Sequence, residues 1–352
     1  MNVLVVGGAG YLGGAVVDLL LKSAHQVRVY DALLYEECYR KPVDFVYGDV
    51  RDDDHLRTEL AWADALVWLA AVVGDRACDL NPDVTVRINE KSVAGLAQNF
   101  SGRIVFTSSC SIYGSQSGRT LTETSPLDPL SLYASTKLAA ERYLAKKNAI
   151  VFRLGTMFGV GDNFARVRLD LVVNTFALQA IQHGKITIFG GNQFRPLLHV
   201  RDAARAVVDA IASSHTGIFN LHRQNVRISD LACQIRNHFP DLIIENVDIP
   251  ARDARDYRVS SDKARALLGF RPIHSIDEGI EQVEELLQTN RLKQPDNPRY
   301  ANDRYLASVG QQAIMTQAPM IPGSGGNGRA REVGTTVAIG RPAEREEAPA
   351  AA

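Results

Sequence analysis

Cysteine is scarce in this chain of 352 residues, and no two of its four cysteines form a C-x-x-C pair. They are scattered, and no histidines stand near them at the spacing of a zinc site. We therefore expect free thiols in a reducing compartment and no metal centre. The four are Cys38, Cys78, Cys110 and Cys233.

Long apolar runs and an excess of one charge are also missing. No apolar stretch reaches the length of a membrane-spanning helix, and the N-terminus lacks the basic region and small-residue cleavage site of a signal peptide. The chain has 39 basic and 40 acidic side chains, so its charge favours neither nucleic acid nor an anionic membrane as a partner. These absences predict a soluble, cytoplasmic protein.

What the chain does have is an alternation of short β-branched segments with longer amphipathic segments over residues 1–160. Repeated βα units with right-handed crossovers stack their strands into a parallel sheet. The predicted fold class is therefore α/β, a doubly wound parallel sheet. The expected strands are Asn2–Val6, Gln26–Tyr30, Phe45–Tyr47, Ala65–Leu69, Arg103–Thr107 and Ile150–Leu154.

Residues 161–306 show a looser pattern, which predicts a smaller substrate-binding lobe over the mouth of the sheet, with some later segments completing the first domain. Helical periods cover Leu169–His183, Ala203–Ser213, Ser229–Asn237 and Ser275–Gln288, and Ile186–Phe189 and Ile218–Leu221 are typical of strands. From residue 307 to 352, Pro, Gly, Ala and Glu dominate and no periodic apolar face remains. This composition predicts a disordered tail.

A G-x-x-G-x-x-G loop directly follows the first expected strand and opens a helix. Glycines at this place let the backbone turn tightly and approach a pyrophosphate, while the helix N-terminus faces the phosphate charge. A glycine-rich turn without a ligand is the simpler alternative. The position between strand and helix favours a Rossmann-type dinucleotide site with contacts from Gly7, Gly10, Tyr11 and Leu12.

Asp31 ends the second strand, where a carboxylate accepts hydrogen bonds from the adenosine ribose and repels a 2′-phosphate. This residue predicts NAD rather than NADP. Asp49 and Val50 follow the third strand, and we expect both to contact the cofactor. For Asp49, an adenine contact and a plain helix cap are both open.

Small side chains end the fourth strand in the segment Leu69-Ala70-Ala71. They let the backbone lie against a cofactor, although small residues at a strand end also simply permit a turn. We expect all three to contact the cofactor.

Catalytic candidates stand at the end of the fifth strand and on the helix that follows. Tyr133 and Lys137 are four residues apart and share one face of that helix, and Ser109 ends the strand. A nearby cation lowers a phenol's pKa and makes it usable in acid–base chemistry. A second pair, Tyr143 and Lys147, points about 80° away at roughly 100° per residue, so we predict that Tyr143 only packs.

Several further motifs occur in order with these residues, and together they resemble the extended short-chain dehydrogenase/reductases, specifically the NAD-dependent nucleotide-sugar epimerase/dehydratase family. The resemblance covers residues 1 to about 290. Besides the glycine loop, Asp31 and Asp49, it is carried by Leu69-Ala70-Ala71, Asn89, Ser108-Ser109-x-x-x-Tyr113-Gly114, Tyr133-x-x-x-Lys137, Arg153 to Gly159, Arg195 to Asp202 and Leu268 to Pro272.

The resemblance implies a bound NAD that takes a hydride from a sugar carbon and later returns it. Tyr133 would transfer the proton, Lys137 would hold the nicotinamide ribose and polarise Tyr133, and Ser109 would hold the sugar oxygen. Asn89 is implied as a further cofactor contact. The resemblance also implies a homodimer, formed through the helix of Tyr133 and its neighbour near Asn89–Asn99.

Cationic and polar residues of the later segments are candidates for the substrate. A nucleoside diphosphate needs fixed cations, and arginine binds phosphate in bidentate fashion. The resemblance makes Arg195 the best phosphate ligand. The later cluster of Arg252, Arg255 and Arg258 is either a phosphate site or a group of solvated loop charges. His199 is expected to organise the turn in which it stands. The other candidates are Arg166, Arg168, Asn174, Arg252, Arg255 and Arg258.

Some positions depart from the family pattern. Dehydratases carry an Asp-Glu pair directly after the catalytic Ser/Thr, where this chain has Cys110 and Ser111, which weighs against dehydration. Thr156 stands where the family's Arg-x-x-Asn motif has its Asn, and Trp68 stands where a His often precedes the Leu-Ala-Ala segment. These two changes affect the expected contacts to the diphosphate and to the cofactor.

The leading hypothesis is an NAD-dependent nucleotide-sugar epimerase acting at C4. The alternatives are a 4-keto-sugar reductase that consumes NAD(P)H, a dehydratase of the same family, and a non-catalytic NAD-binding regulator.

Overall fold

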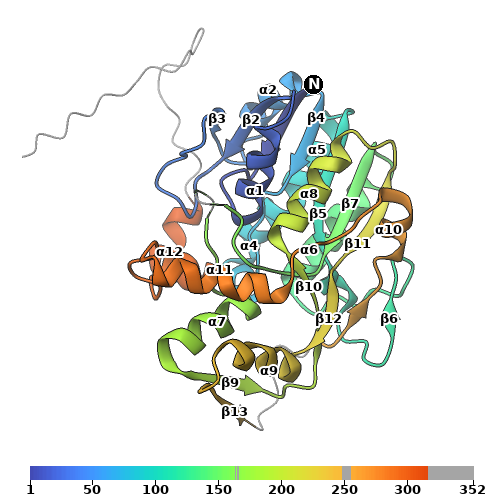
Figure 1. Ribbon diagram of the computed structural model, residues 1–352. Helices are drawn as coiled ribbons and strands as arrows, with labels where there is room; N and C mark the ends of the chain where they lie inside the picture. The colour runs from blue at the N-terminus through green and yellow to red at the C-terminus, as the bar shows by residue number, and fades with distance from the viewer. Residues whose placement is uncertain (163, 165, 248–254, 316–352) are drawn as a thin grey trace, which may run out of the picture. The chain divides into compact units, whose positions relative to one another are not determined.

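Seven parallel strands form the main sheet of the computed structural model, which describes residues 1–162, 164, 166–247 and 255–315 (Figure 1). Their order is β3-β2-β1-β4-β5-β7-β11, so the direction of winding reverses beside β1. This arrangement confirms the predicted Rossmann-type fold. The strands are β1 (Asn2–Val6), β2 (Gln26–Asp31), β3 (Asp44–Tyr47), β4 (Ala65–Trp68), β5 (Arg103–Ser109), β7 (Ala149–Leu154) and β11 (Gly217–Leu221).

Helices cover both faces of this sheet because neighbouring side chains of a strand point to opposite faces. Val3 and Val5 pack with α1 and α8 on one face, whereas Leu4 and Val6 belong to the cluster of α2, α5 and α6 on the other. The bounds are α1 (Tyr11–Leu20), α8 (Val200–Ile211), α2 (Asp53–Trp62), α5 (Ser92–Asn99) and α6 (Leu132–Leu144).

Short elements fill the connections at the carboxyl ends of β4 and β5. Three of them follow β4, and η2 and β6 follow β5. Their bounds are α3 (Asp75–Asp79), α4 (Pro82–Val86), η1 (Arg87–Lys91), η2 (Cys110–Tyr113) and β6 (Thr120–Leu121).

The second lobe has its own apolar core around α7, α9 and α11 and lies at one end of the sheet (Figure 1). All four predicted helical periods are helices, but Ile218–Leu221 lies in β11 of the main sheet. The sheet β12-β10-β8 escaped prediction because its strands are short and β10 contains Pro196. The remaining bounds are β8 (Thr156–Phe158), α7 (Val172–His183), β9 (Lys185–Phe189), β10 (Phe194–His199), β12 (Gln224–Arg227), α9 (Ile228–His238), β13 (Ile243–Val247), β14 (Arg258–Val259), α10 (Asp262–Leu268), α11 (Ile276–Gln288) and η3 (Pro298–Tyr300).

The last described helix, α12 (Asn302–Met315), begins before the predicted tail and continues into it. Residues 307–315, which composition assigned to a disordered tail, are therefore helical. Leu306 packs with Val72, Cys78 and Tyr133, and this distant apolar contact is invisible to a composition argument. Residues 316–352 lie outside the described part of the chain.

A buried ion pair joins α6 to the sheet. Nη2 of Arg153 on β7 lies 2.7 Å from Oε2 of Glu141, and both side chains are at most 3% exposed. The phenol of Tyr113 accepts a further hydrogen bond from Arg153. These bonds fix α6, and hence Tyr133 and Lys137, relative to the strand ends.

No helix among the described residues is long and apolar enough to span a lipid bilayer.

Candidate functional site

A cavity of about 710 Å³ lies at the carboxyl ends of the central strands and extends into the second lobe. This is the edge at which open α/β sheets bind ligands. The glycine loop, the end of β5, α6 and the second lobe all contribute to its wall. The predicted site residues that line it are Gly7, Gly10, Tyr11, Leu12, Leu69, Ala71, Ser109, Tyr133, Lys137, Arg166, Arg168, Arg195 and Arg255.

The glycine loop is packed against other backbone. Gly7 has a φ of +88°, and a Cβ on it would lie 2.5 Å from the amide nitrogen of Ala70. A Cβ on Gly13 would lie 2.3 Å from the carbonyl oxygen of Gly7. Side chains are therefore excluded here, and the loop presents its backbone and the N-terminus of α1 to the cavity. These features fit the diphosphate of a dinucleotide.

Asp31 ties the end of β2 to the glycine loop. One carboxylate oxygen accepts a hydrogen bond from the Ala9 amide at 2.9 Å, and the other accepts one from the Leu33 amide at 2.8 Å. Burial raises the pKa of Asp31, while these two amides oppose the shift. The carboxylate thus stands beside the loop, although neither Asp31 nor Ala70 lines the 710 Å³ cavity. Its contact with the adenosine ribose stays a prediction.

Asp49 and Val50 are arranged differently from the expectation. The carboxylate of Asp49 accepts hydrogen bonds from the backbone amide and the guanidinium of Arg51. The cap of α2 is Asp52, whose side chain accepts from the His55 amide, so the helix-cap alternative for Asp49 is wrong. Val50 is buried in the apolar cluster beside β1, and neither residue lines the 710 Å³ cavity.

Asn89 supports the wall of the cavity from behind. Its side chain accepts from the Val72 amide at 2.8 Å and donates to the Val72 carbonyl at 2.9 Å, and it is only 1% exposed. The residue therefore holds the segment after β4 and does not reach the cavity itself. The expected direct cofactor contact is corrected accordingly, because both polar atoms are bonded to Val72.

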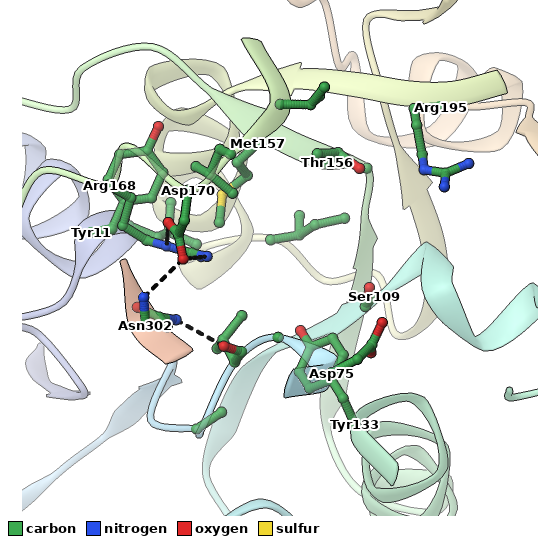
Figure 2. A pocket seen from close by; sticks show the side chains of 18 of the residues that line it. Tyr11, Asp75, Ser109, Tyr133, Thr156, Met157, Arg168, Asp170, Arg195 and Asn302 are labelled. Carbon is green, nitrogen blue, oxygen red and sulfur yellow. Dashed lines mark hydrogen bonds and ion pairs between the residues drawn. The ribbon is translucent and has the colours of Figure 1, made fainter. Parts of the chain in front are cut away.

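Ser109, Tyr133 and Lys137 line the same cavity, as expected, at the end of β5 and the start of α6. Figure 2 shows Ser109 and Tyr133 near each other. The side chain of Ser131 caps α6 by accepting from the Ala134 amide. Nζ of Lys137 donates to the carbonyl of Thr107 at 2.8 Å, and burial lowers the pKa of this lysine to about 8.

The pKa of the phenol differs from the sequence expectation. Burial raises the pKa of Tyr133 above its ordinary value, and a hydrogen bond with Ser109 and the charge of Arg168 only partly oppose this. Lys137 is directed at a backbone carbonyl, so the expected lowering by that lysine does not dominate.

Asp75 is a cavity residue that the sequence analysis missed. It stands at the first position of α3, and Figure 2 shows it on the same side of the cavity as Ser109 and Tyr133. One carboxylate oxygen accepts from Ser131 at 2.7 Å, and the other lies 3.2 Å from Nη2 of Arg255. Its position four residues beyond Ala71 is the only signal that the sequence offers.

The arginines of the second lobe divide into two groups. Arg195 and Arg255 line the cavity near Asp75, and the Arg195 guanidinium donates to the backbone carbonyls of Phe194 and Arg255. Arg166 and Arg168 also line it, Arg168 beside Tyr11 and Arg166 over the ring of Tyr35.

Two arginines of the predicted phosphate cluster do not join the cavity wall. Arg258 lies against the ring of Phe194 and does not line the cavity. Arg252 lies outside the described residues.

Asn174 was expected to bind substrate, and the structure corrects this. Its side chain accepts from the Gly159 amide and donates to the carbonyls of Gly159 and Arg168, and it is 0% exposed. Because its polar atoms are bonded to backbone and no surface is exposed, Asn174 instead holds the backbone at Gly159 and at Arg168.

Other singled-out residues lie away from the cavity. Tyr143 was expected to be a packing residue, but its side chain is 40% exposed and its hydroxyl lies near Glu90. His199 caps α8, and burial lowers its pKa to about 4. Cys110 and Ser111 are buried in η2 and do not line the cavity.

Metal ligands do not gather in the described part of the chain, where no group of three or more His, Cys, Asp or Glu side chains could hold an ion.

Comparison with known proteins identifies the family. Residues 3–221 match the model of the NAD dependent epimerase/dehydratase family. A UDP-glucose 4-epimerase from Lactobacillus helveticus is 26% identical over 352 residues, covering 86% of this chain and 100% of that protein. A UDP-glucuronic acid decarboxylase 1 from Danio rerio is 24% identical over 319 residues, covering 84% of this chain and 75% of that protein.

A solved structure shows the same fold. The dTDP-glucose 4,6-dehydratase DesIV from Streptomyces venezuelae, solved with NAD bound, superposes with a TM-score of 0.72 at 24% identity, covering 83% of this chain and 98% of that chain. The names of these three proteins give three different reactions, so they do not indicate one product for this chain. The resemblance seen in the motifs and the choice of NAD are confirmed, and this chain is a member of the NAD dependent epimerase/dehydratase family.

Proposed function

We propose that this enzyme is a nucleotide-sugar epimerase that acts at C4. The observation that carries the proposal is that Ser109, Tyr133 and Lys137 line one cavity with the glycine loop. Cys110 and Ser111, which stand where dehydratases carry their acid and base, are buried outside that cavity. The site therefore has the groups for reversible oxidation of an alcohol and lacks that Asp-Glu pair.

The chain's own residues would divide the work as follows. The hydroxyl of Ser109 holds the sugar oxygen, and the phenolate form of Tyr133 takes the proton from the C4 hydroxyl and returns it after the keto sugar has turned over. Burial disfavours that form in the site without a cofactor, and the positive charge of a bound nicotinamide would favour it. Lys137, Asp31 and the glycine loop hold the cofactor. When bound, NAD supplies the acceptor for the hydride that leaves C4 and the donor for its return to the opposite face.

The substrate's diphosphate is assigned to Arg195 and Arg255. Arginine provides a planar fork of donors that matches phosphate oxygens, and both side chains line the cavity on the side of the catalytic residues. Asp75 is ion-paired with Arg255 at 3.2 Å and would position it.

A dehydratase is the second candidate, favoured by one observation. Asp75 brings a carboxylate into the same cavity from α3, a different element from the one that carries the dehydratase acids. It is bonded to Ser131 and Arg255, which favours a positioning role over acid–base work.

The direct test is to incubate the purified enzyme with a panel of UDP-, dTDP-, GDP- and CDP-sugars, without added NADH, and to follow the products by NMR. We expect one sugar to be converted to its C4 epimer with unchanged mass. A product that has lost water would select the dehydratase, and conversion only with added NADH would select a reductase.

Removing the Tyr133 hydroxyl should separate chemistry from binding. Tyr133→Phe should keep the fold and NAD binding but lower turnover by about a hundredfold to ten-thousandfold, the usual effect of general acid–base catalysis. Lys137→Ala should weaken both turnover and cofactor retention. Tyr143→Phe is the matched control and should leave kcat unchanged, because that side chain is half-exposed and outside the cavity. An inactive Tyr143→Phe beside an active Tyr133→Phe would refute this placement.

Asp31→Ala should weaken NAD binding and reduce the preference for NAD over NADP. The ribose loses a charged acceptor, and the amides of Ala9 and Leu33 lose theirs, so we expect about a tenfold to hundredfold rise in Kd. Asp44→Ala is the control, because this exposed carboxylate on β3 is paired with Arg28. Equal affinities of wild type and Asp31→Ala for both dinucleotides would contradict the assignment.

We also propose that two subunits associate through α5 and α6. Small, half-buried side chains such as Ala94 and Ala139 stand on these helices, and such residues let helices of two subunits approach closely. Light scattering at micromolar concentration should give the mass of a dimer, and Ala139→Arg should shift it to monomer while Ala139→Ser does not. A monomeric mass for the wild type would rule this interface out.

A further inference from the structure

Cations stand at two opposite ends of the cavity. Figure 2 shows Arg168 beside Tyr11 of the glycine loop and Arg195 across the cavity, beyond Thr156. Arg166 lies 3.7 Å from the ring centre of Tyr35, which follows the end of β2. Arg166 and Arg168 therefore stand over the ends of β1 and β2, whereas Arg195 and Arg255 stand on the side of Asp75 and β10.

Arg168 is fixed in place by a network that spans three parts of the chain. Its guanidinium makes two hydrogen bonds of 2.9 Å to Asp170. Asp170 also accepts from the backbone amide of Asn302, and the Asn302 side chain donates to the carbonyl of Val73 (Figure 2). The start of α12 thus ties Asp170, and through it Arg168, to the segment after β4.

Among the described residues, no carboxylate forms an ion pair with the buried guanidinium of Arg166. Arg166 is 6% exposed, its Nη2 donates to the carbonyl of Arg299, and its Nε has no hydrogen-bond partner among the described residues. The carboxylates that act on it, Asp170 and Glu36, are already bonded to Arg168 and Arg299. Burial lowers the pKa of Arg166 to about 10.

An unmatched guanidinium of this kind costs folding free energy unless an anion meets it. Arg166 lines the same cavity as Gly7, Gly10 and the N-terminus of α1, which is the part of the cavity built for phosphate. The substrate phosphates have their own arginines at the other end. We therefore expect the anion that pairs with the Arg166 guanidinium to bind beside the glycine loop.

We propose that Arg166 and Arg168 bind the diphosphate of the dinucleotide and clamp it against the glycine loop from the second lobe. This inference rests on the proposed cofactor site, and it moves both residues from the substrate, where the sequence placed them, to the cofactor. Because the clamp is locked by Asp170 and Asn302, the dinucleotide leaves only when that network opens. Slow exchange suits a reaction that returns its hydride to the same sugar.

The test compares ligands with and without the diphosphate. After removal of bound nucleotide, the affinities of wild type and Arg166→Gln for NAD, ADP-ribose and adenosine are measured by titration calorimetry. We expect Kd to rise about tenfold to hundredfold for NAD and ADP-ribose, the usual effect of losing a charged hydrogen bond, and to stay unchanged for adenosine. Arg166→Lys, which keeps the charge in the buried site, should fold and lose less affinity.

Arg195→Gln is the matched control at the opposite end of the cavity. It should weaken the binding of UDP and dTDP and leave NAD affinity unchanged, whereas Arg166→Gln should do the reverse. Wild-type NAD affinity in both Arg166 variants, or a loss confined to UDP and dTDP, would overturn the clamp alone. Failure of the wild type to bind NAD or ADP-ribose would overturn the proposed function as well. If the dinucleotide binds in an Arg166-dependent way but no epimerase activity is found, the clamp is supported and only the epimerase is rejected.

Discussion

The close approach of two backbone segments at the end of β1 is the constraint on which the site depends. Gly7 leaves no room for a Cβ beside Ala70, and Gly13 leaves none beside the carbonyl of Gly7. With side chains excluded, the loop, the start of α1 and the segment after β4 meet as bare backbone. Asp31 is tied to this contact through the hydrogen bond that it accepts from the Ala9 amide.

Burial governs the electrostatics of the cavity. It lowers the pKa of Lys137 and of Arg166, and it raises the pKa of Tyr133 and of Asp31. Polar groups that lie out of water need fixed partners, and backbone carbonyls and amides supply many of them. A site arranged in this way meets its substrate with dipoles already in place, which is how a protein stabilises developing charge.

The C-terminal part of the described chain completes the cofactor side of the fold. Leu306 packs with Tyr133, and Asn302 bonds both Asp170 and Val73. The second lobe is therefore connected to the segment after β4 through α12, in addition to the contacts across the cavity. This connection links Arg168 and Asp170 to the segment after β4 that carries Val73.

Local pattern was enough for the main sheet and for the catalytic helix. Alternating apolar runs predicted the strands of the main sheet to within a few residues. The glycine pattern predicted the turn between β1 and α1, and the spacing of Tyr133 and Lys137 placed both residues on one face of α6. Each of these signals depends on residues that are near neighbours in the chain, so the sequence displays them directly.

The partners of the polar residues were decided by the tertiary structure. Arg166 stands over Tyr35, Asn174 bonds the backbone at Gly159, and Asn302 reaches Val73, all contacts between segments far apart in the chain. A sequence lists such residues as available donors and charges, but which of them meets the cofactor, the substrate or another part of the backbone depends on distances that exist only after the two lobes have packed.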